Sequence, residues 1–212
     1  RTLSPGEPLR IASVCRLTEK KGIDVGLRAL SRAAKRGVRF EYHLVGDGPG
    51  RAELERLRDE LGLAGVTTLY GARTREEIRT LLARCHLFLA PSVTAADGDE
   101  EGTPVAIMEA MASGLPVLST VHSGIPEMIE DGVSGALVPE RDDAALAESI
   151  VRLASAPSEW PALARRARQA IEERYDAERL NDSLSTLLTE LGHQRRRPGA
   201  APSGRAARGD FA

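Results

Sequence analysis

Two glutamates, Glu101 and Glu109, flank the expected start of a helix, and both side chains could contact a bound molecule. Thr103 is a favoured N-cap and Pro104 a favoured first helical residue, so we expect the helix to begin there. Glu109 then falls in an apolar stretch, where a carboxylate is costly to bury unless something hydrogen-bonds it. The alternatives are a solvated acidic loop for Glu101 and a structural hydrogen bond for Glu109.

The spacing of these two carboxylates limits the chemistry. Helical and extended rises place them about 10–15 Å apart, which is too far for a paired acid and base. The distance suits two contacts to one long ligand, with backbone N–H groups of the helix start between them for a negative group.

Cationic side chains follow the first expected strand. Arg16 and Lys21 place a guanidinium and an ammonium in a loop before a helix, which suits an anion such as a phosphate. A solvated loop is the alternative. The second strand is followed by the glycine-rich turn 46–50, which lets the backbone approach a ligand closely. Neither a Gly-x-Gly-x-x-Gly fingerprint nor a Gly-x-x-x-x-Gly-Lys-Ser/Thr loop occurs, which disfavours hydride transfer and ordinary nucleotide hydrolysis.

Asp97 and Asp99 form an Asp-x-Asp pair that a divalent metal could use. A divalent ion would want further oxygen ligands placed by a rigid turn, whereas this loop, with its Ala-Ala and Gly, is expected to be mobile, so we expect no metal site. The histidines form neither a nucleophile nor a zinc pattern and are expected to be structural. They are His43, His86, His122 and His193.

Short β-rich runs alternate with amphipathic helical patterns along most of the chain. This alternation is typical of a parallel sheet covered on both faces, and we expect an α/β fold with a doubly wound, Rossmann-like parallel sheet of about six strands. Ligands of such sheets bind beyond the carboxyl ends of the strands. After Pro139 we expect three C-terminal helices that pack across the sheet. The expected strands are 9–14, 40–45, 66–70, 86–90, 115–119 and 136–138, and the last three helices are 142–156, 161–173 and 177–191.

The composition limits the class of protein. With 212 residues, of which 42% are hydrophobic and 28% charged, the chain suits one globular domain plus a tail. Residues before Gly192 are net acidic, which argues against nucleic-acid binding. Cys15 and Cys85 are expected in the core and suit a reducing compartment. We recognise neither a membrane-spanning stretch nor a signal peptide, so a cytoplasmic location is expected.

We expect residues 1–192 to form one domain and 193–212 a disordered basic tail. The arginines of the tail could give the full enzyme peripheral contact with anionic lipid at the inner face of a membrane, and a solubilising tail is the alternative. The first residue is not Met. A piece of a longer protein, or a processed chain, is therefore expected.

Taken together, these motifs resemble the donor-binding half of family 4 glycosyltransferases, which have the two-domain GT-B fold. The likeness extends from about Leu9 to Leu191 and is strongest at Glu101 and Glu109, which match the Glu-x7-Glu motif of the family. Segments 16–22, 45–49, 70–71 and 124–135 support it in the same order. Segments 96–101 and 122–127 further resemble the colanic-acid and exopolysaccharide branch.

The resemblance implies a role for each matching residue. Arg16 and Lys21 would hold the diphosphate of a UDP- or GDP-sugar, Glu109 the ribose hydroxyls, and Glu101 the hydroxyls of the transferred sugar. Such enzymes are retaining and need no bound metal or other cofactor, because Arg, Lys and helix-start amides stabilise the departing diphosphate. Glu101, Arg16 and Lys21 are thus the expected catalytic residues.

The remaining donor contacts implied by the resemblance are largely from the backbone. The base would meet the backbone at Ala72 and Arg73, after Gly71, and the other expected contacts are Gly46, Gly102, Thr103 and Val105. Two residues depart from the family pattern. Cys15 stands where glycine usually precedes the arginine, and Pro104 replaces a common glycine and removes one N–H.

The family's N-terminal acceptor domain has no counterpart in this sequence. We therefore expect the donor domain of a retaining hexosyltransferase of polysaccharide biosynthesis, with an acceptor that is a glycan, a lipid-linked sugar or a small molecule. Its partners would be the nucleotide-sugar donor and the acceptor domain of the same protein, and the isolated chain should transfer little or no sugar. The alternatives are a non-catalytic nucleotide-sugar-binding module and a GT-B sugar-nucleotide epimerase.

Overall fold

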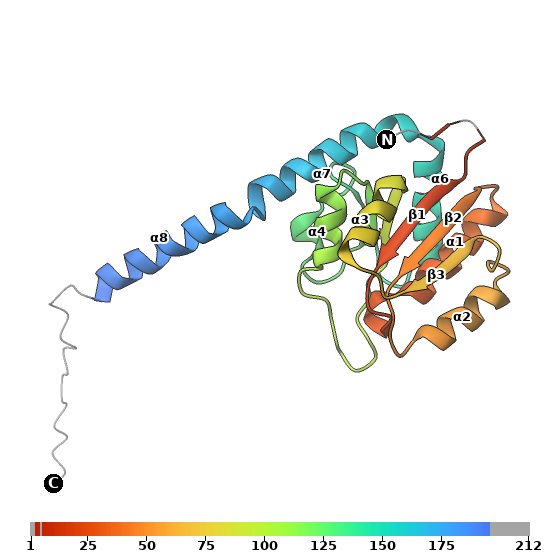
Figure 1. The fold of residues 1–212 in the computed structure, drawn as a ribbon, viewed down its shortest axis with the longest axis horizontal. Helices are drawn as coiled ribbons and strands as arrows, with labels where there is room; N and C mark the ends of the chain where they lie inside the picture. The colour runs from red at the N-terminus through yellow and green to blue at the C-terminus, as the bar shows by residue number, and fades with distance from the viewer. Residues whose placement is uncertain (1–2, 5, 196–212) are drawn as a thin grey trace, which may run out of the picture. The chain divides into compact units, whose positions relative to one another are not determined.

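The computed structural model describes residues 3–4 and 6–195, and its first compact unit is built on a six-stranded sheet (Figure 1). The strand order is β3-β2-β1-β4-β5-β6, and every pair of neighbouring strands is parallel. The predicted doubly wound parallel sheet is therefore confirmed. The strands are β1 (Leu9–Val14), β2 (Phe40–Val45), β3 (Thr67–Gly71), β4 (Leu87–Ala90), β5 (Val117–Thr120) and β6 (Ala136–Val138).

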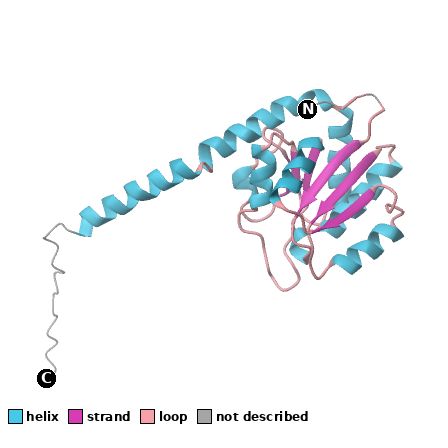
Figure 2. Cartoon of the chain, viewed as in Figure 1, coloured by secondary structure: helices cyan, strands magenta, loops and turns pink. Residues whose placement is uncertain are grey.

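Helices cover both faces of this sheet, as expected for right-handed connections between parallel strands. Figure 1 shows α3 and α4 on the opposite side of the sheet from α1 and α2 (helices are cyan in Figure 2). The helices between the strands are α1 (Ile23–Lys35), α2 (Arg51–Glu60), α3 (Arg75–Arg84), α4 (Val105–Ala112) and the short α5 (Ile125–Met128), and a 3₁₀ turn, η1 (Glu19–Lys21), precedes α1.

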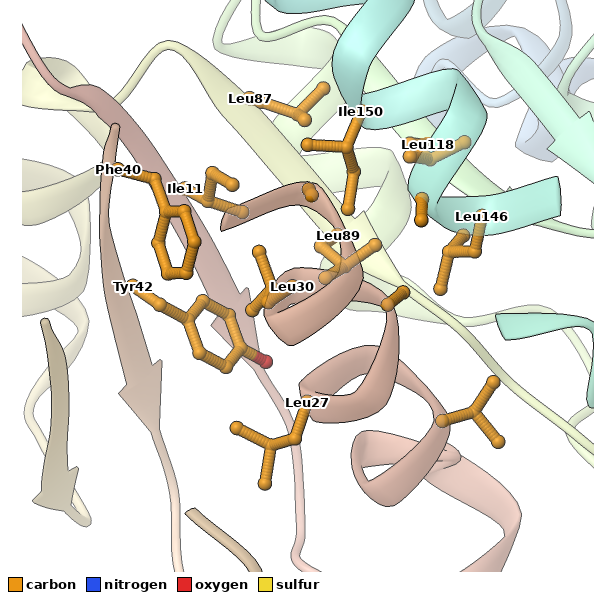
Figure 3. Packing of buried hydrophobic residues seen from close by; sticks show 14 of the residues in the cluster. Ile11, Leu27, Leu30, Phe40, Tyr42, Leu87, Leu89, Leu118, Leu146 and Ile150 are labelled. Carbon is orange, nitrogen blue, oxygen red and sulfur yellow. The ribbon is translucent and has the colours of Figure 1, made fainter. Parts of the chain in front are cut away.

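The main hydrophobic core lies between the sheet, α1 and α6 (Asp143–Ser155) (Figure 3). Leu27 and Leu30 of α1 pack against strand residues such as Ile11, and Ile150 comes from α6. The Tyr42 hydroxyl is buried here and donates to Ser13 Oγ at 2.8 Å, and Ser13 Oγ in turn donates to the Leu89 carbonyl. Side-chain hydrogen bonds thus link β2, β1 and β4 close to their carboxyl ends.

Three helices follow β6, as predicted: α6, α7 (Trp160–Arg174) and α8 (Ala177–Arg195), with a 3₁₀ turn η2 (Pro157–Glu159) before α7. Helix α6 packs against α1, β5 and β6. The Trp160 indole is buried and donates to the Leu153 carbonyl at 3.1 Å, which joins the start of α7 to the end of α6.

The first compact unit ends at Glu173, before the expected domain boundary at residue 192. In the second unit, Asp176 caps α8 by accepting the Arg179 N–H at 3.0 Å. Residues 193–195 are helical in α8, and the rest of the predicted basic tail lies outside the described residues. No helix in the described part of the chain combines the length and apolar character that a bilayer span requires.

Candidate functional site

The candidate site lies at the carboxyl edge of the sheet, around the point between β1 and β4 where the strand order reverses direction. Parallel sheets of this kind bind ligands at such a point because the adjacent loops diverge there and leave a crevice. The loop after β1 contains Arg16 and Lys21, and the loop after β4 contains Glu101.

The structure brings Lys21 and Glu101 into direct contact. Lys21 Nζ lies 2.7 Å from Glu101 Oε2, and Lys20 Nζ lies 4.0 Å from Glu101 Oε1. Lys20 instead pairs with Asp99 at 2.9 Å. Arg16 is exposed, and within the described residues no ion pair or side-chain hydrogen bond is recorded for its guanidinium. Lys21 is thus held by a site carboxylate, and the Arg16 guanidinium has no such partner among the described residues.

Glu101 is a buried carboxylate with one unused oxygen. Glu101 is 8% exposed, and its Oε1 has no hydrogen-bond partner in the described structure. A buried acceptor without a donor costs about 1–3 kcal/mol, which a hydrogen-bond donor that reaches Oε1 would recover. A hydroxyl group on a ligand would satisfy it. The solvated-loop alternative for Glu101 is therefore wrong.

His122, expected to be structural, lies against Glu101. The backbone N–H of Glu101 donates to His122 Nε2 at 3.0 Å, and His122 Nδ1 lies 2.6 Å from Glu140 Oε1. Glu140 Oε2 also accepts the Thr94 N–H at 2.7 Å. Burial alone would raise the pKa of Glu140, but the hydrogen bonds from Thr94 and His122 hold it below its ordinary value. The sequence signal available for both residues is that each closely follows a strand.

The start of α4 differs from the prediction by one residue. Pro104, with ψ 107°, is the N-cap and Val105 the first helical residue, whereas Thr103 lies outside the helix and makes no capping hydrogen bond. The Ile107 N–H is the first to bond within the helix, to the Pro104 carbonyl at 3.0 Å. The amides of Val105 and Ala106 therefore have no intrahelical acceptor.

A small cavity of about 20 Å³ lies between the start of α4 and the loop after β1. Its lining includes Cys15, Lys21, Pro104 and Ala106. Burial raises the pKa of the Cys15 thiol to about 12, so this thiol is protonated and inert as a nucleophile at neutral pH. Lys21 and the free helix-start amides thus lie at one place, which can bind an anionic group.

Gly46 and Gly71 also come together. The Gly46 N–H donates to the Gly71 carbonyl at 2.9 Å, and the two residues form an isolated bridge. Gly46 has φ +127°, and a Cβ atom there would stand 1.8 Å from the Cys15 carbonyl oxygen. Glycine at this position therefore allows the loops after β1 and β2 to touch.

Ala72 and Arg73 are exposed just beyond Gly71. The Arg73 guanidinium lies over the Tyr70 ring at 5.9 Å, and the Tyr70 hydroxyl lies 3.0 Å from His43 Nδ1. Tyr70 and Arg73 line a cavity of about 510 Å³ beside α3. The space could accept a planar group, and the base-binding role of these residues stays a prediction.

Glu109 differs from the expectation drawn from its apolar neighbours. Its side chain is exposed, because the buried residues of α4 are Ile107, Ala110 and Met111 on another face. The expectation of a buried carboxylate there is therefore wrong. Its ribose-binding role stays a prediction.

The Asp97–Asp99 loop is tied to its neighbours. Asp97 Oδ1 accepts the Asp99 N–H at 3.0 Å, the Ala95 N–H donates to the Asp99 carbonyl at 2.9 Å, and Lys20 neutralises Asp99. These contacts define the backbone of the loop, and its mobility stays a prediction. Across the described residues, no group of three or more His, Cys, Asp or Glu side chains is arranged to hold a metal ion.

The sequence matches a known protein family. Residues 1–183 match the family described as Glycosyl transferases group 1. Over 189 residues the chain is 43% identical to the colanic acid biosynthesis glycosyltransferase WcaL of Escherichia coli (strain K12), covering 89% of this chain and 47% of that protein. Over 185 residues it is 44% identical to the amylovoran biosynthesis glycosyltransferase AmsK of Erwinia amylovora, covering 87% and 46%. The chain thus spans about half the length of these relatives.

Solved structures show the same fold. Anabaena Alr3699/HepE in complex with UDP and glucose superimposes with a TM-score of 0.77 and 26% identity, over 86% of this chain and 48% of that one. The C-terminal domain of a glycosyl transferase group 1 family protein, LpcC of Francisella tularensis, gives a TM-score of 0.69 at 22% identity, over 80% and 87%.

Proposed function

Because this chain belongs to the glycosyl transferases group 1 family, with the GT-B type of fold, we propose that it is the donor-binding half of a retaining glycosyltransferase of exopolysaccharide biosynthesis. Glu101 and its surroundings give the most direct support. A buried carboxylate with an unused oxygen, Glu101, lies beside Lys21 at the edge where a sheet of this type binds ligands. A hydroxyl-bearing group joined to an anion fits this pair.

The donor proposed is a nucleoside diphosphate sugar. UDP is bound by the HepE relative in its solved structure. In this chain the diphosphate would lie between the Arg16 guanidinium, the Lys21 ammonium and the amides of Val105 and Ala106. Each of these groups donates hydrogen bonds or carries positive charge, so together they favour a diphosphate without a bound metal.

The proposed reaction breaks the bond between the anomeric carbon of the sugar and the diphosphate oxygen. Negative charge then increases on the departing diphosphate, and donors already in place stabilise it most effectively because they need not reorganise during the reaction. Arg16 and Lys21 provide this stabilisation. Glu101 orients the sugar by accepting a hydroxyl hydrogen bond at Oε1.

An acceptor domain would complete the enzyme. The chain spans about half of the length of WcaL and AmsK, which leaves room in such proteins for a second domain of similar size. We propose that the acceptor binds to that domain and that this chain alone binds the donor with negligible transfer. The acceptor would be a glycan, a lipid-linked sugar or a small molecule.

Isothermal calorimetry with a panel of UDP- and GDP-sugars tests the function. We expect the chain to bind one nucleoside diphosphate and its sugar conjugate equally well with and without a chelator. Glu101→Gln should weaken the sugar conjugate about ten-fold and spare the free nucleotide, because a hydrogen bond to a charged group contributes roughly 1.5–3 kcal/mol. Glu148→Gln, a change of an exposed carboxylate on α6, is the matched control. Failure of the unmodified chain to bind any member of the panel would overturn the proposal, and loss of binding in chelator would favour a metal at Asp97 and Asp99.

A further inference from the structure

His122 is buried at the candidate site and uses both ring nitrogens. The side chain is fully buried, Nε2 faces the Glu101 N–H and Nδ1 faces a Glu140 carboxylate oxygen. No step of the proposed function uses this ring. The ring thus connects the loop after β4, through Glu101, to the loop after β6, through Glu140.

The partners determine which nitrogen carries the proton. A backbone N–H can only donate, so Nε2 must accept and cannot itself be protonated. The hydrogen therefore lies on Nδ1 and is donated to Glu140 Oε1, 2.6 Å away. Glu140 is held in turn by the Thr94 N–H at its other oxygen. The Glu140 carboxylate thus stabilises the tautomer of His122 that is protonated at Nδ1. In this tautomer Nε2 accepts the backbone N–H of Glu101.

The peptide that His122 holds is the one that leads into Glu101. Gly102, next in the chain, has no side chain to restrict this segment, and its carbonyl packs closely on Gly124, where an added Cβ would stand 3.0 Å away. Ser123, next to His122, has φ 44°, a conformation that is costly for a non-glycine residue and is retained where the surroundings impose it. The loop after β5 is therefore shaped to hold the loop after β4.

We propose that His122 is a positioning residue for the sugar end of the donor, acting through Glu101. Lys21 anchors Glu101 at Oε2 and His122 anchors it at the backbone, so two separate contacts fix the position of the carboxylate and of its unpaired Oε1. The inference rests on the proposed function, because it assigns Oε1 to a sugar hydroxyl. Glu140 supports the arrangement by holding the Nδ1–H.

Three substitutions separate the two hydrogen bonds of the ring. His122→Asn keeps a short amide donor that can reach toward Glu140 but has no acceptor long enough for the Glu101 N–H. His122→Gln places a terminal oxygen near the position of Nε2 and can accept that N–H. His122→Phe keeps the ring and removes both contacts.

The readout is calorimetric affinity for the free nucleoside diphosphate and for the sugar conjugate that the unmodified chain binds best among UDP-glucose, UDP-galactose, GDP-mannose and GDP-fucose. We expect His122→Asn and His122→Phe to weaken the sugar conjugate about three- to ten-fold, the effect of one lost hydrogen bond, and to leave the nucleotide within about two-fold. His122→Gln should restore most of the loss. In a Glu101→Gln background, His122→Asn should add less than about two-fold, because the residue acts through Glu101.

Other results would show whether the inference on His122 or the proposed function is wrong. Equal weakening of nucleotide and conjugate, or a lower melting temperature with unchanged affinities, would show a general structural role and overturn the inference. Full additivity with Glu101→Gln would also overturn it. If Glu101→Gln selectively weakens the conjugate and the His122 variants do not, the positioning role alone is wrong. If the unmodified chain binds no member of the panel, the proposed function itself is wrong.

Discussion

The Lys21 ammonium and the Glu101 carboxylate meet at 2.7 Å, although one side chain follows β1 and the other follows β4. The side chain of Glu101 is 7% exposed and that of Lys21 is 21% exposed. Solvent therefore screens this pair less than a surface ion pair. In the proposed site the same contact would join the group that binds the diphosphate to the group that binds the sugar.

Adjacent lysines allow a matched test of this contact. Lys21→Met should weaken binding of the free nucleoside diphosphate about ten-fold or more, because it removes a cation at the anion site and leaves Glu101 without its partner. Lys20→Met, which removes a more exposed pair with Asp99, should change the affinity less than about three-fold. Calorimetry under identical salt conditions compares the two variants, and equal effects would show that the position of the charge is unimportant.

Glu109 has a different expected signature. If it binds the ribose, Glu109→Gln should weaken the free nucleotide and the sugar conjugate by the same factor, about ten-fold, because both ligands contain ribose. Its exposed position means that the melting temperature should stay within about 1 °C of the parent. Wild-type affinity for both ligands would remove Glu109 from the site, and a large loss of stability would indicate a structural role.

Gly46 should tolerate no side chain. Gly46→Ala should lower the free energy of unfolding by about 3 kcal/mol or more, because the new Cβ overlaps the Cys15 carbonyl and φ is +127°. Gly37→Ala is the control: φ there is +89°, but nothing lies within 4 Å of the added atom, so only backbone strain of about 1 kcal/mol is expected. Urea unfolding measures both values, and similar losses would show that the loop contact contributes little.

Glu140 should make stability depend on pH. Its pKa is lower in the folded state than its ordinary value of 4.5, so ionised Glu140 stabilises the fold above that value, and the contribution is lost as pH falls through the folded pKa. Glu140→Gln should be less stable than the parent at pH 7 by about 1 kcal/mol or more. The difference should shrink as pH is lowered below 4.5 in urea unfolding experiments. A constant difference would contradict this assignment of the pKa.

Most of the fold was predictable because each strand is an apolar run followed by a helical pattern. The predicted bounds of β1, β2 and β6 agree with the structure. Strand β5 begins at Val117 and not at the predicted residue 115, because the Leu115 N–H bonds to the Ala110 carbonyl and closes the end of α4 instead of entering the sheet. The single turn of α5 was not predicted, since four residues hold too little periodicity to detect.

The sequence predicts which residues belong to the candidate site better than it predicts which of them contact one another. Residues that follow strands were recognised, and the structure brings Lys21 to Glu101 and Gly46 to Gly71. The His122 contact could not be predicted, because its partner is a backbone N–H, which no residue type marks. Exposure of Glu109 was also missed, since apolar neighbours in sequence point to other faces of the helix.

Strand β1 lies in the middle of the sheet, paired with β2 on one side and β4 on the other. Detaching β1 would divide the sheet into two pieces and expose the buried residues on both. The backbone amides of Ile11 to Val14 should therefore exchange with solvent only in the fully unfolded state, whereas those of the loops after β2 and β3 can exchange through local opening. The strand that leads into the loop of Arg16 and Lys21 is thus among the last parts of the domain to lose structure.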